Sequence, residues 1–496
     1  MKSTWAALTP LAAPIFVIAL LAAGCGPEQP ASRLRMTYPH ELVTMDPHAH
    51  SDGVTRRVLS AVYEGLVQFK PGSPVQPCLA DRWTTPDAFT WRIHLRDGVR
   101  FHDGRHLTAD DVVASIERAR SGENRGQQLD DIEGIQVAEN DVRTIEVKTR
   151  HPAPLLLTRL ESVAIVPRDF KLSVPIGTGP YRLRAGSVDG PVLLERWDEY
   201  WARAPDFDQI TIQFVSLLEE LADLVDSQNV DVVALAQERF VNDFEPTPGW
   251  RVEALPAVAT TYLGINITTP PFDDLRVRKA IDDLIDRRQL VSEIYPPGYA
   301  TPAYSLVSPK IFGYGPEQRA KHPDPEQARQ LLVDAGVKPE TELNLDFQAR
   351  YEPVVAPLAA MLAEAGLVVV PRSHEYETFY RRLEEAENDL FFFSWNFRVP
   401  DASPFLELFV QSRNPDRGHG SFNGAALSDP EIDRLLEEAA HETRSESRLD
   451  LLQTLLADVD AKYVYLPLFR PAPIALVREP LEVLGHCMRP QDVHLR

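Results

Sequence analysis

Cysteine is scarce in this chain of 496 residues, which has only Cys25, Cys78 and Cys487. So few cysteines exclude the disulfide framework of a small secreted domain. Their wide spacing also lacks the paired cysteines of a zinc motif. Cys78 and Cys487 would be able to pair in an oxidising compartment, but two buried thiols explain them equally well. Cross-links and structural zinc therefore do not define this fold.

An excess of positive charge is also missing. Lysine and arginine number 51 against 73 acidic residues, and the formal net charge is -22. Nucleic acids and anionic membrane surfaces are bound through basic patches that displace counterions, and the sequence has no such patch. We therefore expect no nucleic acid partner. The composition is that of an ordinary globular protein, with 44% hydrophobic and 25% charged residues, and the length allows about two or three domains.

Catalytic motifs are absent as well. The stretch GTGPY, Gly177 to Tyr181, lacks the serine of a nucleophile elbow and the lysine of a phosphate-binding loop. With 73 acidic residues, carboxylates pair by chance, and none of these pairs lies in a motif. We predict that the chain is not an enzyme and binds no cofactor, with a peptide hydrolase as the less favoured alternative.

Three histidines admit a second interpretation. His102 beside Asp103 has the composition of a general-base pair, and His48 with His50 would reach one metal from an extended strand. A histidine and an aspartate in a turn more often form a structural hydrogen bond. We favour the structural interpretation for all three histidines and expect no metal site.

The N-terminus has the order of parts of a secretory signal. Lys2 precedes an apolar run from Ala6 to Ala23 that ends in the small residues LAAGC. A membrane-spanning anchor is the alternative, but Pro10 and Pro14 interrupt the run. The segment resembles a bacterial lipoprotein signal. This resemblance implies a signal peptide at 1–24, a lipid on Cys25 and a polar tether at 25–32.

Short β-branched or aromatic runs alternate with amphipathic segments along the body of the chain. The predicted strands include 90–95, 144–149, 210–215 and 343–347. Predicted helices begin at three capped positions: Thr108 with Asp111, Asp324 with Pro325, and Ser428 with Glu431. This pattern predicts a mixed α/β fold. Because no single linker divides the chain, we expect domains between which the chain passes more than once.

Five stretches, in this order, resemble landmarks of the family 5 extracellular solute-binding proteins, the peptide and oligopeptide receptors of ABC importers. They are TMDPHAHSDGVTRRVLSAVYEGLV, WRIHLRDGVRFHDGRHLTADDVVASIERA, PIGTGPYRL, PPFDDLRVRKAIDDLIDRRQLV and DPEIDRLLEEAAHET. The resemblance extends from about residue 34 to residue 476. Its most specific element is Leu95 to Gly104, where Gly98 and Gly104 predict two tight turns around a short strand.

The resemblance implies an α/β fold, a two-lobed clamp of the periplasmic-binding-protein kind with an additional third domain. The implied limits are 33–72, 175–260 and 472–496 for the first lobe, 73–174 for the third domain and 261–471 for the second lobe. The chain would cross between the lobes near ATTYLGINI and near YLPLFRPAPI, both of which also have the composition of strands. Such a clamp closes around its solute by hinge bending.

The implied function is that of a monomeric, lipid-anchored receptor on the periplasmic or extracellular face of a membrane. It would bind a peptide-like or other small solute and deliver it to the permease subunits of an ABC importer. A clamp of the same fold acting as a sensor or chaperone, without transport, is the alternative. Titration with short peptides separates these functions, because a receptor returns them intact, a hydrolase consumes them and a chaperone ignores them.

Several residues are candidates for the wall of the solute site. Tyr262 and Asn266 follow the first crossing between the lobes, and Trp395 with Asn396 and Phe397 ends an apolar strand where a cleft would begin. Aromatic faces and amide groups suit solutes with varied side chains. The alternative is that these aromatic residues belong to the core, above all Phe397 and the preceding run of phenylalanines.

Arg398 departs from the pattern of the resembled family. In its peptide-binding members an aspartate follows the tryptophan by three residues and binds the ammonium group of the peptide, whereas here the frame of Trp395 and Pro400-Asp401 encloses an arginine. Arg398 and Asp401 are therefore also candidates to bind the solute. A cation at that place repels an ammonium group, so the sequence predicts a solute that is anionic, N-blocked or not a peptide. The alternative is that Arg398 pairs with Asp401 or Glu407 outside the cleft.

Overall fold

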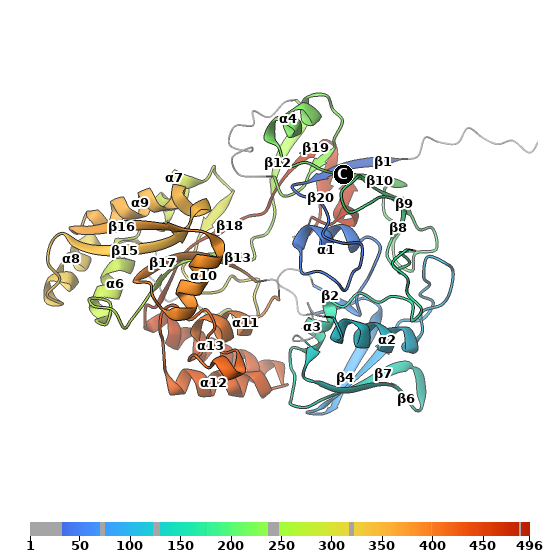
Figure 1. Ribbon diagram of the computed structural model, residues 1–496, viewed down its shortest axis with the longest axis horizontal. Coiled ribbons are helices and arrows are strands. Elements are labelled where there is room, and N and C mark those ends of the chain that lie inside the picture. Colours follow the sequence, from blue (N-terminus) through green and yellow to red (C-terminus); the bar gives the residue numbers. More distant parts are fainter. Residues whose placement is uncertain are drawn as a thin grey trace, which may run out of the picture.

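The chain forms two lobes and a third domain that lies beside one of them (Figure 1). The structure is a computed structural model, and it describes residues 32–69, 75–122, 129–173, 175–236, 248–316, 322–397, 399–485 and 488–496. Each part is built on its own sheet, so we name them the seven-strand lobe, the six-strand lobe and the four-strand domain. This architecture is the α/β clamp with an additional domain that the sequence predicted.

The seven-strand lobe has a mixed sheet with helices against both of its faces. The sheet runs in the order β12 (Trp250–Ala254), β19 (Ile474–Arg478), β11 (Val232–Val233), β1 (Arg33–Tyr38), β10 (Gln209–Phe214), β9 (Val192–Arg196) and β8 (Tyr181–Ala185). Only the pairs of β1 with β10 and with β11 are parallel. Helix α1 (Gly53–Leu59) packs into the core on one face, and α4 (Leu218–Asp226) packs into the core on the other.

The six-strand lobe buries both faces of its sheet. The order is β14 (Ala300–Pro302), β18 (Tyr465–Pro471), β13 (Ala259–Ile265), β17 (Leu390–Asn396), β15 (Thr341–Gln348) and β16 (Leu367–His374). The core on one face includes α6 (Leu275–Leu284), α7 (Arg287–Ile294), α8 (Pro325–Asp334) and α9 (Glu352–Ala363). The core on the other face includes α10 (Tyr376–Glu385), α11 (Ser403–Phe405), α12 (Pro430–His441) and α13 (Ser445–Ala461).

The aromatic run of β17 lies at the centre of this lobe. Phe391, Phe392 and Phe393 have no exposed surface, and they alternate between the cores on the two faces of the sheet. On the neighbouring strand, a Cβ atom at Gly264 would lie 2.2 Å from the ring of Phe391. Glycine is needed there because the ring covers the backbone of β13. The run of phenylalanines is therefore a strand buried on both faces.

Two short segments are the only covalent connections between the two lobe sheets. The chain leaves β12 and enters β13 through residues 255–258, and it returns from β18 to β19 through 472–473. The strands on each side of this crossing are paired, since β12 pairs with β19 and β13 with β18. The backbone N–H of Leu255 donates to the carbonyl of Pro473 at 2.8 Å. The crossing is therefore a double strand that continues from one sheet into the other.

The four-strand domain is an antiparallel sheet covered by helices. Its order is β4 (Ala80–Asp87), β5 (Thr90–Leu95), β7 (Asp141–Thr149) and β6 (Ile132–Ala138). Helices α2 (Ala109–Arg120) and α3 (Leu156–Glu161) share its core. The core also contains Cys78, whose thiol is free and buried, whereas Cys487 lies outside the described residues. The domain limits inferred from the sequence remain a prediction.

Helix starts follow local capping chemistry. The Thr108 and Asp111 side chains form the expected capping box of α2, and Asp324 caps α8 with Pro325 in its first turn. The expected cap at Ser428 is wrong by one residue, because Asp429 accepts the N–H groups of Glu431 and Ile432. Pro430 occupies the first helical position, which leaves the residue before it as the cap.

The described helices include none that combines the length and the hydrophobicity required to cross a bilayer. The apolar N-terminal run and Cys25 lie outside the described residues.

His102 joins the four-strand domain to the seven-strand lobe. Gly98 and Gly104 adopt positive φ angles in the two predicted turns, and the strand between them is reduced to one bridge between Arg100 and His106. The His102 Nε2 atom lies 2.9 Å from the Gly179 carbonyl, and the Gly177 N–H donates to Nδ1 at 3.3 Å. These contacts require the neutral ring with its proton on Nε2. His102 and the GTGPY turn thus form one structural contact.

The neutral ring of His102 makes stability depend on pH. Burial lowers its pKa from 6.5 to about 4, and this effect exceeds the opposing bond to Gly179. Below pH 6.5 the histidine of the unfolded chain becomes protonated, whereas His102 in the folded chain stays neutral down to about pH 4. The contribution of neutral His102 to the free energy of unfolding is therefore lost as pH falls from 6.5 to about 4. We expect the stability advantage of the wild type over His102→Gln to shrink by about 2–3 kcal/mol between pH 7 and pH 4 in urea unfolding. A pH-independent difference would contradict this assignment.

Candidate functional site

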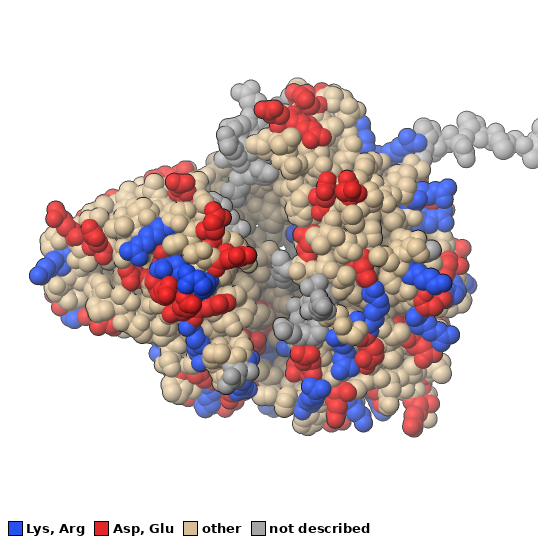
Figure 2. Space-filling model, in the orientation of Figure 1, with Lys and Arg blue, Asp and Glu red and all other residues tan. Residues whose placement is uncertain are grey.

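A hollow separates the six-strand lobe from the rest of the molecule (Figure 2). The surface visible inside it carries few charged side chains. A cavity of about 700 Å³ lies between the four-strand domain and the six-strand lobe. Small-molecule sites typically have volumes of about 300–1,000 Å³. The cavity is therefore of the right size for a small solute, and its two walls belong to different bodies of the molecule.

The walls of this cavity are largely aromatic and apolar. The four-strand domain contributes Trp83, Trp91 and Leu155, and the six-strand lobe contributes Phe312 and Tyr314. Smaller polar and charged groups interrupt this surface and can orient a solute: Thr84, Thr158, Lys310, Thr443 and Ser445. A few polar groups within an apolar wall are the usual arrangement in small-molecule sites.

A buried ion pair lies at the wall formed by the six-strand lobe. Arg448 binds Asp401 in a forked geometry, with Nη1 2.6 Å from Oδ2 and Nη2 3.0 Å from Oδ1, and both side chains are 6% exposed. The guanidinium also donates to the Ser403 hydroxyl at 2.7 Å and to the Ala439 carbonyl at 3.0 Å. Both carboxylate oxygens of Asp401 thus accept hydrogen bonds from Arg448. Because Arg448 belongs to α13 and Asp401 to the loop before α11, the pair joins these two segments.

The four-strand domain and the six-strand lobe meet next to the cavity. The exposed rings of His151 and His441 face each other across this contact, with centroids 6.2 Å apart. Glu407 lies in a π-helical turn, Leu406–Val410, and burial raises the pKa of its carboxyl. The guanidinium of Arg159 on α3 opposes that shift, so the two bodies interact electrostatically there.

Two of the predicted wall residues lie in the core instead. Tyr262 has no exposed surface, stacks between Phe393 and Phe405, and donates its hydroxyl to the Leu306 carbonyl. Asn266 is 2% exposed and donates to two backbone carbonyls of the turn before β17. The physical reason is the central position of β13, which is covered on both faces, so proximity to the crossing does not expose its side chains.

The end of β17 places the other candidates differently. Trp395 is partly exposed and packs edge-on against Phe409, and Asn396 is exposed. Phe397 is 3% exposed and belongs to the core, in agreement with the alternative interpretation. Arg398 lies outside the described residues. Of the six predicted solute-binding residues that the structure describes, Asp401 is the one that lines the 700 Å³ cavity.

The aromatic residues of the cavity carry no local signal in the sequence. Trp83 and Trp91 belong to the four-strand domain, whereas Phe312 comes from a loop of the six-strand lobe. Alternation predicts which residues of a strand share a face but not that this face meets another body. The lining of the cavity was therefore missed.

The rings of His102 and His48 contact groups of the protein itself. His48 is 3% exposed and its ring contacts the Ala164 carbonyl at 2.7 Å and the Arg118 guanidinium at 2.6 Å. His50 is buried as well. Among the residues that the structure places, no group of three or more histidine, cysteine or acidic side chains could hold a metal ion.

Comparisons with known proteins agree with this geometry. Residues 74–416 match the model of the bacterial extracellular solute-binding proteins, family 5 Middle. The chain is 26% identical over 424 residues to the dipeptide-binding protein of Escherichia coli K12, covering 75% of this chain and 77% of that protein. It is 28% identical over 467 residues to a probable di/tripeptide-binding protein 5 of Pseudomonas aeruginosa, covering 86% and 87%. Its fold is similar to that of HbpA2 from Haemophilus parasuis, with a TM-score of 0.82, 21% identity and coverage of 94% and 100%.

The Asp401–Arg448 pair should act on stability. Asp401→Asn leaves a buried guanidinium without its counter-charge, and we expect a loss of about 3–5 kcal/mol in the free energy of unfolding, measured in urea. Asp401→Leu combined with Arg448→Met should recover most of this loss, because no buried charge remains. The exposed pair of Glu431 and Arg434 provides the control, and Glu431→Gln should change stability little. Wild-type stability in Asp401→Asn together with weakened solute binding would instead make Asp401 a ligand group.

Proposed function

The chain belongs to family 5 of the bacterial extracellular solute-binding proteins, and we propose that it captures its solute between the six-strand lobe and the four-strand domain for delivery to an ABC importer. One observation carries this proposal. The 700 Å³ cavity takes its walls from two bodies, and the sheets of the two lobes are linked only through 255–258 and 472–473. A solute that contacts both walls favours the closed state by the contacts that it gains there.

The solute class follows from the relatives and from one substitution. The relatives in Escherichia coli and Pseudomonas aeruginosa are named for dipeptides and for di- and tripeptides, which supports a peptide-like solute. Arg398 stands where the resemblance places the aspartate that binds an ammonium group. We propose that the solute is anionic, N-blocked or not a peptide, because an unpaired cation in a closed cleft disfavours an ammonium group by several kcal/mol, in order of magnitude.

The contacts of Asp401 bear on the alternative partner for Arg398. Both oxygens of Asp401 accept hydrogen bonds from Arg448, which already neutralises the carboxylate. Glu407 is the other carboxylate near in sequence, and burial raises its pKa, which disfavours the charged form. Neither carboxylate is therefore well suited to neutralise Arg398. This supports an anionic group of the solute as its counter-charge.

The location and the absence of catalysis are parts of the same proposal. The N-terminal segment supports export and lipid attachment at Cys25, which would hold the receptor at the periplasmic or extracellular face of a membrane. Family membership supports binding without chemistry. The receptor is proposed to act as a monomer and to dock on permease subunits.

Charge reversal at Arg398 tests the solute class. In calorimetry with one short peptide in free and N-acetylated forms, we expect the wild type to bind the acetylated form at least about tenfold more tightly. Arg398→Asp should reverse this preference, because it restores a carboxylate for the ammonium group. Arg417→Asp makes the same charge change at an exposed site of the same lobe and should preserve the wild-type preference. Tight wild-type binding of the free form, weakened by acetylation, would overturn the proposed solute class.

Lipid attachment is tested by labelling growing cells with a fatty acid. The wild-type protein should carry the label and sediment with membranes, and Cys25→Ala should lose the label and enter the soluble fraction. Cys78→Ala removes a buried thiol of the folded part and should keep the label. Complete membrane association of an unlabelled Cys25→Ala protein would rule out this anchor.

A further inference from the structure

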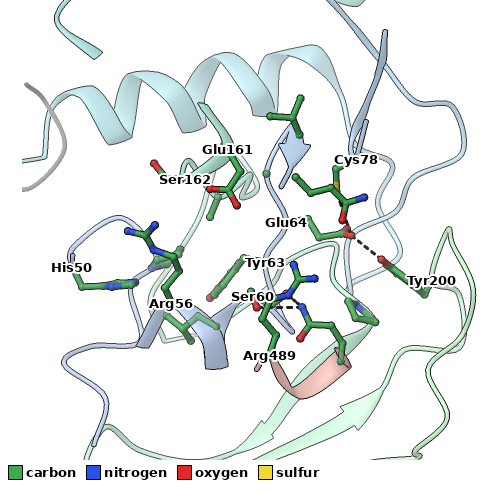
Figure 3. Close-up of a pocket in the computed structure, with 18 residues that line it drawn as sticks. His50, Arg56, Ser60, Tyr63, Glu64, Cys78, Glu161, Ser162, Tyr200 and Arg489 are labelled. Carbon is green, nitrogen blue, oxygen red and sulfur yellow. Dashed lines mark hydrogen bonds between the residues drawn. The ribbon is translucent and has the colours of Figure 1, made fainter. Parts of the chain in front are cut away.

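A second cavity lies next to α1, away from the cleft cavity described above (Figure 3). Its volume is about 160 Å³, and it shares no lining residue with the 700 Å³ cavity. Its walls come from α1 and the turn that follows, from the end of α3 and from the C-terminal segment around Arg489. Polar and charged side chains are prominent among them, as Figure 3 shows. This cavity is separate from the one proposed for the capture of solute.

Arg56 contributes a cation without a counter-charge to this cavity. Its side chain is partly buried, and its Nε atom is shielded from solvent. Within the described part of the chain, Arg56 forms no ion pair and no side-chain hydrogen bond. Arginine is rarely buried unless it is paired. The guanidinium therefore has donor capacity that the described protein groups do not use.

Tyr63 adds a second unused donor on the same side of the cavity. Arg56 belongs to α1, Ser60 is its C-cap and Tyr63 follows the helix, and all three residues line the cavity. Tyr63 is 4% exposed, and its hydroxyl makes no hydrogen bond to another described residue. Burial raises the pKa of this hydroxyl, so it remains a proton donor. Figure 3 shows Tyr63 between Arg56 and Arg489.

The other charges around the cavity are already satisfied. Glu64 accepts hydrogen bonds from Thr178, Tyr200 and Trp201 at 2.8–2.9 Å, and burial raises its pKa. Arg489 forms a forked pair with Asp492. Glu161 has an interaction of its own, and no ion pair joins it to Arg56 in the part of the chain that the structure describes. Arg56 is therefore the charge in this wall that still requires a partner.

We propose that this cavity binds a carboxylate or phosphate group, with Arg56 as the ionic partner and the Tyr63 hydroxyl as a second donor. Both groups present acceptor oxygens that match the forked donors of a guanidinium. The volume is sufficient for one such group with a few bound waters. The group can be a free anion or the carboxylate end of a small solute, and the proposal holds for either source.

Thermal unfolding with simple anions tests the site. At constant ionic strength, 10 mM inorganic phosphate or acetate in place of chloride should raise the Tm of the wild type by about 1–2 °C. Arg56→Gln should abolish this rise and Tyr63→Phe should reduce it. Arg57→Gln removes the same charge from the neighbouring position of α1, outside the cavity lining, and should respond like the wild type. An equal rise in Arg56→Gln and in the wild type, or no rise in the wild type, would overturn the proposal.

Calorimetry then distinguishes the two sources. N-acetyl-dialanine and its C-terminal amide differ only in the carboxylate, and Arg56→Gln should weaken binding of the acid about tenfold without affecting the amide if a solute supplies the group. Unchanged binding of the acid, together with the loss of the phosphate effect, identifies a free anion. Failure of both peptides to bind the wild type counts against a peptide-like solute, while the anion experiment still decides whether this site exists.

Discussion

All relative movement of the two lobes passes through a double strand only a few residues long. Because β12 continues into β13 and β18 into β19, the two connections are held side by side by the same pairing that builds the sheets. Such a joint permits bending of one lobe toward the other and restricts independent sliding. Bending at this joint changes the distance between the two lobes and leaves the interior of each lobe unchanged. A solute can therefore respond to this bending only if it contacts both sides of the cleft.

The rigidity of the six-strand lobe comes from its buried aromatic residues and from one ion pair. Phe393 stacks on Phe409 at 4.7 Å, and Tyr262 stacks on both Phe393 and Phe405. The Asp401–Arg448 pair then joins α13 to the loop that follows β17. A side chain at the cavity wall is therefore supported by a packed core, which keeps its position fixed while the joint moves.

Local chemistry made much of the fold predictable, and long-range packing made the site difficult to predict. The cap at Thr108 and the alternation in 90–95 depend on neighbouring residues, so they can be recognised in the sequence. Tyr262 was assigned to a solute wall because it follows the crossing, yet the central position of β13 buries it. Trp83 and Phe312 line one cavity only because the four-strand domain packs next to the six-strand lobe, and no local sequence pattern indicates that packing.

The four-strand domain is inserted in the chain before the joint, yet it supplies Trp83 and Trp91 to the cavity. Its attachment through His102 uses backbone groups of Gly177 and Gly179 rather than variable side chains. Sequence divergence on this insert can therefore reshape one wall of the cavity while the mechanical parts stay intact. One wall of the cavity and the joint thus belong to separate segments of the chain, so a change of the insert alters that wall without altering the joint.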